Sequence, residues 1–576
     1  MSRPVRWRRW LLLAVLVVAV AVIAGRNWLQ SGGGVAADSW VLLDLEGTYA
    51  EEVPDAPIAR LLGEPSVSFL DLLLTIRDAG EDPRVAGLVV RIRPLAMGWG
   101  KAEEIRAALT KFRASGKPLH AYLELELGGG TMEYFVASAA DRIHVPPGAA
   151  APVTGLLAQF VFLGGVWEKF DVEMQVLKIR EYKTFGDMLS EKTMTSHHRE
   201  MADALLDSLY GNVIDAIATD RKLEPAALRA IIDAGPATPD ELQKAGLVDD
   251  TQFLDQLRAT LVGADGEWLT ADDYAASRRP LPGAPMVRQQ LAVIYGVGTV
   301  TTGESDTMPG GGDGSMGADT LIEAFNTAAA DDEVAAIVFR IDSPGGSALA
   351  ADLIWQAAHA AREHKPVVVS MSDVAASGGY YVAAPATRVV ANPGTITGSI
   401  GVVMAKPNVS GLLAKLGINT VELQRGEMAS LLSLTDSLTP AKLARLNATM
   451  EYVYDLFIGR VASGRALEKA QVNEVGRGRV WTGEQALEHR LVDELGGFLT
   501  AINAAKKAAG IPVDERVGLV FYPQEKSLLQ RLSKALGTQL RAAAPPWWQQ
   551  IERATVAWQF PAGSILTLMP QDVSVR

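Results

Sequence analysis

Apolar runs of the buried-strand type recur along the chain, and each is followed by a helical pattern. Val85-Ala-Gly-Leu-Val-Val-Arg-Ile92 and Val334-Ala-Ala-Ile-Val-Phe-Arg-Ile341 are nearly continuous in aliphatic residues, which is typical of strands buried on both faces. Segments 101–113 and 350–362 follow with helical periodicity, and each leads to a Lys-Pro pair that opens another apolar run. Strand, helix and strand in this order predict an α/β fold with parallel sheets and right-handed crossover helices.

The chain also repeats itself. Besides the two apolar runs, segment 134–143 resembles 380–389, and the Leu-Val-Asp triplet that ends at Asp249 returns at Asp493. The offset drifts only from 249 to 244 positions, and several matches in one order indicate a duplication. We therefore expect two tandem α/β repeats over 40–260 and 290–510. A linker rich in Pro, Arg and Ala at 268–286 would join them, and a C-terminal extension over 512–576 would include a basic amphipathic helix at 526–541.

The first 30 residues have the pattern of a membrane anchor. Four arginines, at positions 3, 6, 8 and 9, precede an apolar run that begins at Trp10 and covers about 24 Å as a helix. A cleaved signal peptide would share this pattern, but the only small-x-small site, at 19–21, lies inside the run. We expect an uncleaved single-pass anchor in the inner (cytoplasmic) membrane, with the catalytic body on the periplasmic or other extracytoplasmic side.

Composition narrows the possible functions. A chain of 576 residues is too long for one ordinary core. The formal net charge of −13 argues against a nucleic-acid partner, because the phosphate backbone requires clustered Lys and Arg. There is no cysteine, which removes disulfides, thiolate catalysis and Cys-ligated metal sites. No metal or organic cofactor is suggested.

A candidate nucleophile stands where a predicted strand meets a predicted helix. Ser377 is followed by Gly378 and a second glycine, so its hydroxyl is exposed beside the amides of a helix start. Gly345-Gly346 follows the preceding strand and can bring further backbone donors to the same edge of the sheet. Either motif alone is explained by a tight turn, but the two together predict an oxyanion hole.

A nucleophilic serine needs a base. None of the histidines lies in a glycine-rich or otherwise constrained setting, and His197 and His198 fall in a polar stretch typical of a solvated helix start. A Ser-His-Asp arrangement nevertheless stays open at this point. The seven histidines are His120, His144, His197, His198, His359, His364 and His489.

Four motifs resemble the long, duplicated form of the signal peptide peptidase A family, over about residues 40–510. They are Arg180-Glu-Tyr-Lys183-Thr, Ser343-Pro-Gly-Gly346, Ala-Ala-Ser377-Gly-Gly-Tyr-Tyr and Gly398-Ser399-Ile-Gly401. The resemblance implies a membrane-anchored serine endopeptidase with Ser377 as nucleophile, Lys183 as base and Ser399 holding the lysine amine. It further implies a fold related to Clp peptidase and crotonase, a bowl-shaped homotetramer with its rim near the membrane, and released signal peptides or other short apolar peptides as substrates.

The duplication supports one active site per chain, formed between the repeats. Ser377 aligns with Thr131, and Lys183 aligns with Ala429, so each repeat keeps one half of the dyad. A free lysine has a pKa of about 10.4 whereas a general base works best at about 7–8, so the amine must be buried without a carboxylate partner. Glu181 and Asp187 are the nearby carboxylates of concern.

Two other functions fit part of the pattern. A crotonase-like enzyme acting on an acyl-CoA also uses a glycine-built oxyanion hole, although the N-terminal anchor and the Ser-Gly-Gly context disfavour it. A catalytically inactive membrane scaffold that binds peptides is the other alternative. Labelling by a fluorophosphonate, and turnover of a fluorogenic peptide, distinguish these possibilities from a serine peptidase.

Overall fold

The computed structural model describes residues 35–52, 67–127, 129–263, 266–278, 289–306, 314–523 and 566–568. The predicted anchor within residues 1–30 and the predicted amphipathic helix at 526–541 lie outside the described residues. Within the part of the chain that the structure describes, no helix has the length and apolar character needed to cross a bilayer.

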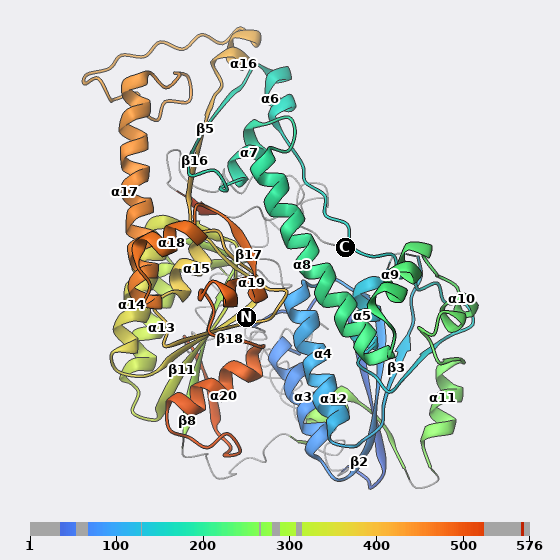
Figure 1. The fold of residues 1–576 in the computed structure, drawn as a ribbon. Coiled ribbons are helices and arrows are strands. Elements are labelled where there is room, and N and C mark those ends of the chain that lie inside the picture. Colours follow the sequence, from blue (N-terminus) through green and yellow to red (C-terminus); the bar gives the residue numbers. More distant parts are fainter. Residues whose placement is uncertain are drawn as a thin grey trace, which may run out of the picture.

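A fully parallel sheet forms the centre of the first repeat (Figure 1). Its apolar strands are buried because helices cover them, and the β2 segment is buried along most of its length. The strand order is β6-β4-β3-β2-β1-β7, with β1 Ser39–Gly47, β2 Val85–Leu95, β3 Leu119–Leu123, β4 Arg142–Val145, β6 Asp250–Thr251 and β7 Trp268–Thr270.

The helices of the first repeat begin at recognisable sequence signals. Thr238 caps α10 in a capping box with Glu241, and Thr195 caps the 26-residue helix α8. The helices are α3 Phe69–Glu81, α4 Trp99–Ala114, α5 Thr131–Ala137, α6 Gly164–Phe170, α7 Phe185–Ser190, α8 Ser196–Arg221, α9 Pro225–Ala234, α10 Pro239–Lys244, α11 Leu254–Leu261 and α12 Ala271–Ser277.

The second repeat has a larger sheet of the same design. Its strands are parallel except for the antiparallel pair β15 and β17. The main order is β17-β15-β13-β11-β8-β19, and β14 joins β13 to β18. The bounds are β8 Gln290–Val297, β11 Val334–Ser343, β13 Val367–Ala376, β14 Arg388–Ala391, β15 Ile396–Gly398, β17 Val480–Thr482, β18 Glu494–Leu495 and β19 Gly518–Tyr522.

Equivalent elements return in the same order in the second repeat. The 26-residue helix α17 matches α8, and the Thr482 capping box of α19 matches that of α10. Tyr134 and Tyr380 each donate a hydrogen bond to a leucine carbonyl, at 2.7 and 2.8 Å. The helices are α13 Ala318–Ala330, α14 Ala348–Arg362, α15 Gly378–Ala383, α16 Ser410–Lys415, α17 Pro440–Arg465, α18 Lys469–Val475, α19 Gly483–Glu488 and α20 Phe498–Ala508.

A third, mixed sheet joins the two repeats. It has the order β10-β9-β12-β20-β16-β5, in which β5 of the first repeat runs antiparallel to β16 of the second. These two strands form a ribbon that extends toward α6 and α16 in Figure 1. The bounds are β5 Glu173–Ile179, β9 Thr299–Thr301, β10 Ser315–Gly317, β12 Gly345–Ser347, β16 Val402–Asn408 and β20 Leu566–Leu568.

Two predicted boundaries are wrong. The segment 268–286 was expected to be a linker, but it begins with strand β7, paired in parallel with β1, and with helix α12. The segment 512–576 was expected to be an extension, but β19 pairs in parallel with β8 at the edge of the second sheet. Both strands border the first strand of their sheet. The matches between the repeats end before them, so the sequence comparison assigned them to neither repeat.

Candidate active site

Ser377 stands at a sharp turn between strand β13 and helix α15. Its backbone has φ 57° and ψ −113°, a conformation that a residue with a side chain rarely adopts. The turn is held because the Ser377 amide donates to the Gly398 carbonyl at 2.8 Å and the Tyr381 amide donates to the Ser377 carbonyl at 2.8 Å. The strained turn and the two hydrogen bonds that hold it place the Ser377 hydroxyl at the carboxyl end of the sheet.

The amine of Lys183 lies 2.6 Å from the Ser377 hydroxyl oxygen. Lys183 follows β5 of the first repeat, and the pairing of β5 with β16 carries it to the second repeat. The same amine is 2.9 Å from the Ser399 carbonyl oxygen and 3.0 Å from the Ser399 hydroxyl oxygen. The structure therefore brings the predicted nucleophile, base and lysine-orienting serine into one cluster.

Burial sets the electrostatics of the lysine. Lys183 is 1% exposed, and this desolvation holds the pKa of its amine well below the ordinary lysine value. The two carboxylates of concern are engaged elsewhere: Glu181 pairs with Arg477 at 2.9 Å, and Asp187 pairs with Lys178. Among the described residues no carboxylate forms an ion pair with Lys183, so no opposite charge offsets the cost of charging it.

The segment 476–479, which the sequence analysis missed, holds the lysine and Ser399 in place. The Ser399 amide donates to the Arg479 carbonyl at 2.7 Å, and the Gly478 amide donates to the Ile400 carbonyl at 2.7 Å. Gly478 has φ 85°, and a Cβ at this position would lie 2.4 Å from the Lys183 backbone nitrogen. The two glycines in Gly-Arg-Gly-Arg signal a tight turn, but they carry no information on what that turn contacts.

The predicted oxyanion donors lie at the amino end of α15 and on β12, which is in contact with that helix. Gly378 is the first residue of α15, where a helix leaves amides without intrahelical partners. Helix α15 packs closely on the Ser343 turn, since a Cβ at Gly379 would lie 2.6 Å from the Ser343 carbonyl oxygen. The Gly345 amide, predicted to be a free donor, instead donates to the Ser343 hydroxyl at 3.2 Å, and Gly346 lies in β12.

A buried ionic cluster supports the second repeat from the first, and sequence reasoning did not find it. The Lys101 amine on α4 lies 2.7 Å from Asp342, 3.4 Å from Asp373 and 3.3 Å from Glu51. Burial alone would lower the pKa of Lys101, but these carboxylates hold it well above its ordinary value. Asp342 directly precedes Ser343, so the cluster braces a turn of the candidate site.

The same cluster binds the backbone at the start of α4. Asp373 accepts hydrogen bonds from the amides of Gly98 at 2.9 Å and Lys101 at 2.7 Å. Asp342 also accepts from the Val374 amide at 3.1 Å, three residues before Ser377. The first turn of α4 is thereby fixed to the ends of β11 and β13, the two strands that lead to the candidate catalytic turns.

The histidines do not replace the lysine. The base that the Ser377 hydroxyl contacts is the Lys183 amine. The prediction that His198 belongs to a solvated helix start is wrong. The described helix α8 does begin at Ser196, but His198 is fully buried against the rings of Phe160 and Phe162, with centroids 4.8 and 5.6 Å away.

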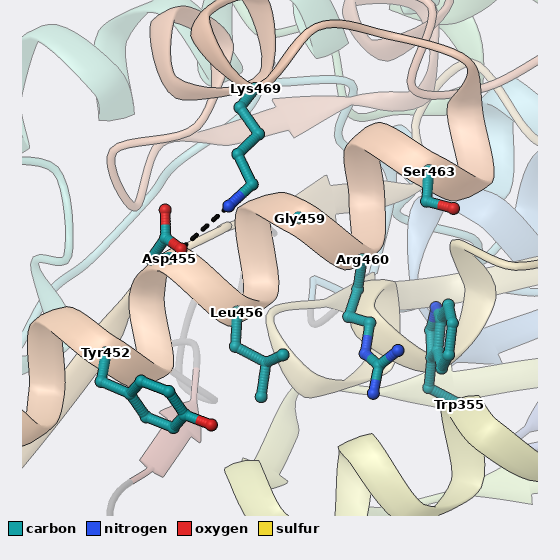
Figure 2. Close-up of a pocket in the computed structure, with 8 residues that line it drawn as sticks. All are labelled: Trp355, Tyr452, Asp455, Leu456, Gly459, Arg460, Ser463 and Lys469. Carbon is teal, nitrogen blue, oxygen red and sulfur yellow. Dashed lines mark hydrogen bonds and ion pairs between the residues drawn. The ribbon is translucent and has the colours of Figure 1, made fainter.

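A separate pocket opens beside α17 (Figure 2). Its charged side chains already have partners, since Lys469 pairs with Asp455 at 2.9 Å and Arg460 stacks 3.9 Å from the centroid of Trp355. Neither Ser377 nor Lys183 lines it. We therefore place the chemistry at the serine and lysine, where the geometry is reactive, and not in this pocket.

Comparison with known proteins places these features in a known family. The model of peptidase family S49 matches residues 111–265 and again 359–512, which confirms the duplication. The chloroplastic serine protease SPPA of Arabidopsis thaliana is 36% identical over 470 residues, covering 80% of this chain and 68% of that protein. Protease 4 of Salmonella typhi is 28% identical over 572 residues, covering 94% and 90%. A protein of Enterococcus faecium provisionally named signal peptide peptidase SppA is 32% identical over 184 residues, covering 31% and 52%.

Proposed function

The chain belongs to peptidase family S49 and is a serine peptidase, and we propose that Ser377 and Lys183 are its catalytic dyad. The observation that carries this proposal is the 2.6 Å contact between the Lys183 amine and the Ser377 hydroxyl in a site that excludes water from the amine. A desolvated lysine is neutral at lower pH than a solvated one, and only the neutral amine can accept a proton.

The proposed mechanism follows from these contacts. Lys183 accepts the proton of Ser377, whose oxygen attacks a peptide carbonyl carbon, and the amide of Gly378 stabilises the oxyanion with Gly345-Gly346 beside it. Lys183 returns the proton to the leaving amine, and water then hydrolyses the acyl-enzyme with the lysine again as base. Ser399 acts on the lysine, because its hydroxyl and carbonyl oxygens hold the amine in position.

We propose released signal peptides and other short apolar peptides as substrates. The support is the similarity to proteins whose names include signal peptide peptidase SppA and Protease 4. Membership of a peptidase family sets aside the acyl-CoA alternative, and the dyad geometry disfavours an inactive scaffold. Incubation with a synthetic signal peptide, followed by mass spectrometry of the products, tests the substrate class; an intact peptide after long incubation contradicts it.

Substitution tests the dyad. Ser377→Ala and Lys183→Met should each lower kcat/KM for a fluorogenic apolar peptide by at least about a thousandfold, because each removes a group that takes part in every turnover. Ser463→Ala and Lys469→Met, at side chains away from the dyad, are the matched controls and should retain activity. Near-native turnover by either dyad variant, with an unchanged melting temperature, contradicts the assignment.

We further propose that residues 1–30 anchor the enzyme in the inner (cytoplasmic) membrane, with the catalytic body on the extracytoplasmic side. The support is the apolar run beginning at Trp10 and the arginines before it. Deleting residues 1–30 should move the protein from the membrane fraction to the soluble fraction after lysis. Protease protection of the body in spheroplasts contradicts the proposed orientation.

We also propose that the protein forms a homotetramer. Large apolar side chains are exposed near the end of the β5–β16 ribbon, among them Phe170, Leu416, Val421 and Leu423, the last two at 86% and 91%. Exposed apolar groups gathered in this way are typical of a contact surface. Light scattering of the solubilised protein should give four chains per particle, and the double variant Val421→Asp, Leu423→Asp should reduce that number; a monomeric native chain contradicts the proposal.

A further inference from the structure

Strand β20 is far in sequence from the two strands with which it pairs. Residues Leu566–Leu568 lie between β12 and β16 in the third sheet and pair antiparallel with both. Leu568 is opposite Gly345, Thr567 is opposite Gly346, and Leu566 is opposite both Ser347 and Val403. Three residues from the last part of the chain thus form the central strand between two elements that are close in sequence to the candidate catalytic turns.

The two flanking strands and one neighbouring helix all belong to the candidate active site. Strand β12 contains the predicted oxyanion glycines Gly345 and Gly346. Strand β16 begins at Val402, three residues after Ser399. Helix α15, which begins directly after Ser377, is also in contact with β20. The segment therefore lies along the backbone that carries the nucleophile, the oxyanion donors and the lysine-orienting serine.

Extended peptides bind to proteins in the same manner as β20 does here. A peptide that adds a strand to an open sheet edge gains its affinity from backbone hydrogen bonds, which are available to many sequences. If β20 were removed, the facing edges of β12 and β16 would offer such a slot. The composition Leu-Thr-Leu also fits the short apolar peptides proposed as substrates.

We propose that β20 is a tethered occupant of the peptide-binding groove, which a substrate must displace before it can reach Ser377. This inference rests on the proposed peptidase function. Strand β20 runs from Leu566 to Leu568, which is opposite Gly345. A substrate in the same place binds antiparallel to β12 and β16, with the residues on the amino-terminal (acyl) side of its scissile bond along these strands. The segment acts as a competitor supplied by the enzyme itself.

A tethered competitor has a defined kinetic effect. Its effective concentration is of the order of millimolar, so it raises KM by a factor of one plus that concentration divided by its own dissociation constant. For an occupant that binds with a dissociation constant of roughly 0.1 mM, KM rises about tenfold. Because substrate binding displaces the segment, kcat is unchanged at saturation.

Two deletions test the proposal. Removing residues 566–576 should lower KM for a short apolar fluorogenic peptide by about tenfold without changing kcat, whereas removing residues 569–576 retains β20 and should leave KM unchanged. Adding the synthetic peptide of residues 563–569 to the shorter chain should restore the higher KM competitively. Equal KM values for the two deletions, with native melting temperatures, overturn the proposal.

A second variant and a binding measurement keep the test independent of folding and turnover. Thr567→Pro in the full chain removes a backbone donor from the middle of β20 and should lower KM in the same direction. With Ser377→Ala in each chain, fluorescence anisotropy should show that a fluorescein-labelled apolar peptide binds about tenfold more tightly after removal of residues 566–576. That result supports β20 as the occupant even if no variant cleaves peptides, and equal affinities refute it.

Discussion

The Lys183→Met variant tests whether catalysis and folding stability depend on the protonation of the same group, the Lys183 amine. The side chain is 1% exposed, and its desolvation lowers the pKa of the amine when the chain folds. In the unfolded chain the same amine has an ordinary pKa of about 10.4. Between these two pKa values the unfolded chain binds a proton that the folded chain does not, so folding releases a proton and stability rises with pH.

The sign of the prediction follows from this difference. As pH falls from about 10 toward the folded pKa, the native chain loses stability relative to Lys183→Met by about 1.36 kcal/mol per pH unit. Below the folded pKa the lysine is protonated in both states, and the gap between the two proteins stays constant. The size of this gap between the two proteins is the free-energy cost of keeping the Lys183 amine neutral in the folded chain.

Lost hydrogen bonds set a constant offset that does not affect the test. Methionine cannot replace the contacts of the amine with Ser377 and Ser399, and each buried group left without a partner costs roughly 1–3 kcal/mol. This cost is independent of pH. The pH at which the gap stops growing, and not the absolute value of the gap at one pH, therefore marks the lysine pKa.

The assay compares melting temperatures of both proteins from pH 6 to pH 10, together with kcat/KM of the native enzyme. Since catalysis needs the neutral amine, kcat/KM should rise with pH through the folded pKa and then level off. The midpoint of that rise should coincide with the pH at which the stability gap stops growing. Lys469→Met, whose side chain is 55% exposed, is the control and should show no widening gap.

Two outcomes would refute the reasoning. If the melting temperatures of the native chain and Lys183→Met shift in parallel over the whole range, folding does not perturb the lysine. If the kinetic midpoint and the stability plateau differ by more than about one pH unit, the group that limits catalysis is not Lys183.

Two further predictions concern residues that support the dyad. Gly478→Ala should lower kcat/KM by at least about tenfold, because its Cβ would lie 2.4 Å from the Lys183 backbone nitrogen; Gly417→Ala, at φ 72° with open space around it, should cost stability but not activity, and equal activity losses would contradict this. Lys101→Met should lower the free energy of unfolding by about 3–5 kcal/mol, measured in guanidinium chloride, because it leaves Asp342 and Asp373 without their cation while Glu51 keeps Arg340. Lys415→Met, at an exposed pair 3.7 Å apart, should cost less than about 1 kcal/mol, and similar losses for both lysines would contradict the role of the buried cluster.

The sequence predicted the parallel sheets of the two repeats because their signal is local, but it did not predict the third, mixed sheet. Continuous apolar runs predicted the positions of β2 and β11. The candidate nucleophile was predicted from two motifs together, since Ser377-Gly-Gly alone is explained by a tight turn but Gly345-Gly346 follows the preceding strand at the same edge of the sheet. The lysine was not predictable from spacing, because 194 positions separate it from Ser377, and only the family resemblance identified it.

The features that were missed depend on tertiary contacts. Lys101 has the pattern of an ordinary helix residue, and nothing local shows that its amine is buried among Asp342, Asp373 and Glu51. Strand β7 has three residues and β20 has three, too few for the alternating pattern that identifies a strand. Such short strands form because neighbouring strands offer edges to them, which is information that the segment itself does not contain.

The duplication explains why one chain needs both repeats for one reaction. The first repeat has Thr131 where the second has Ser377, yet it supplies both the proposed base and, through Lys101, the brace of the Ser343 turn. A lysine can be kept neutral only where water and carboxylates are excluded, and an interface between two well-packed sheets provides such a place more readily than a surface loop. Substitutions at Lys183 and Lys101 should therefore impair catalysis although both lie in the first repeat, because one is the proposed base and the other braces the turn at Ser343.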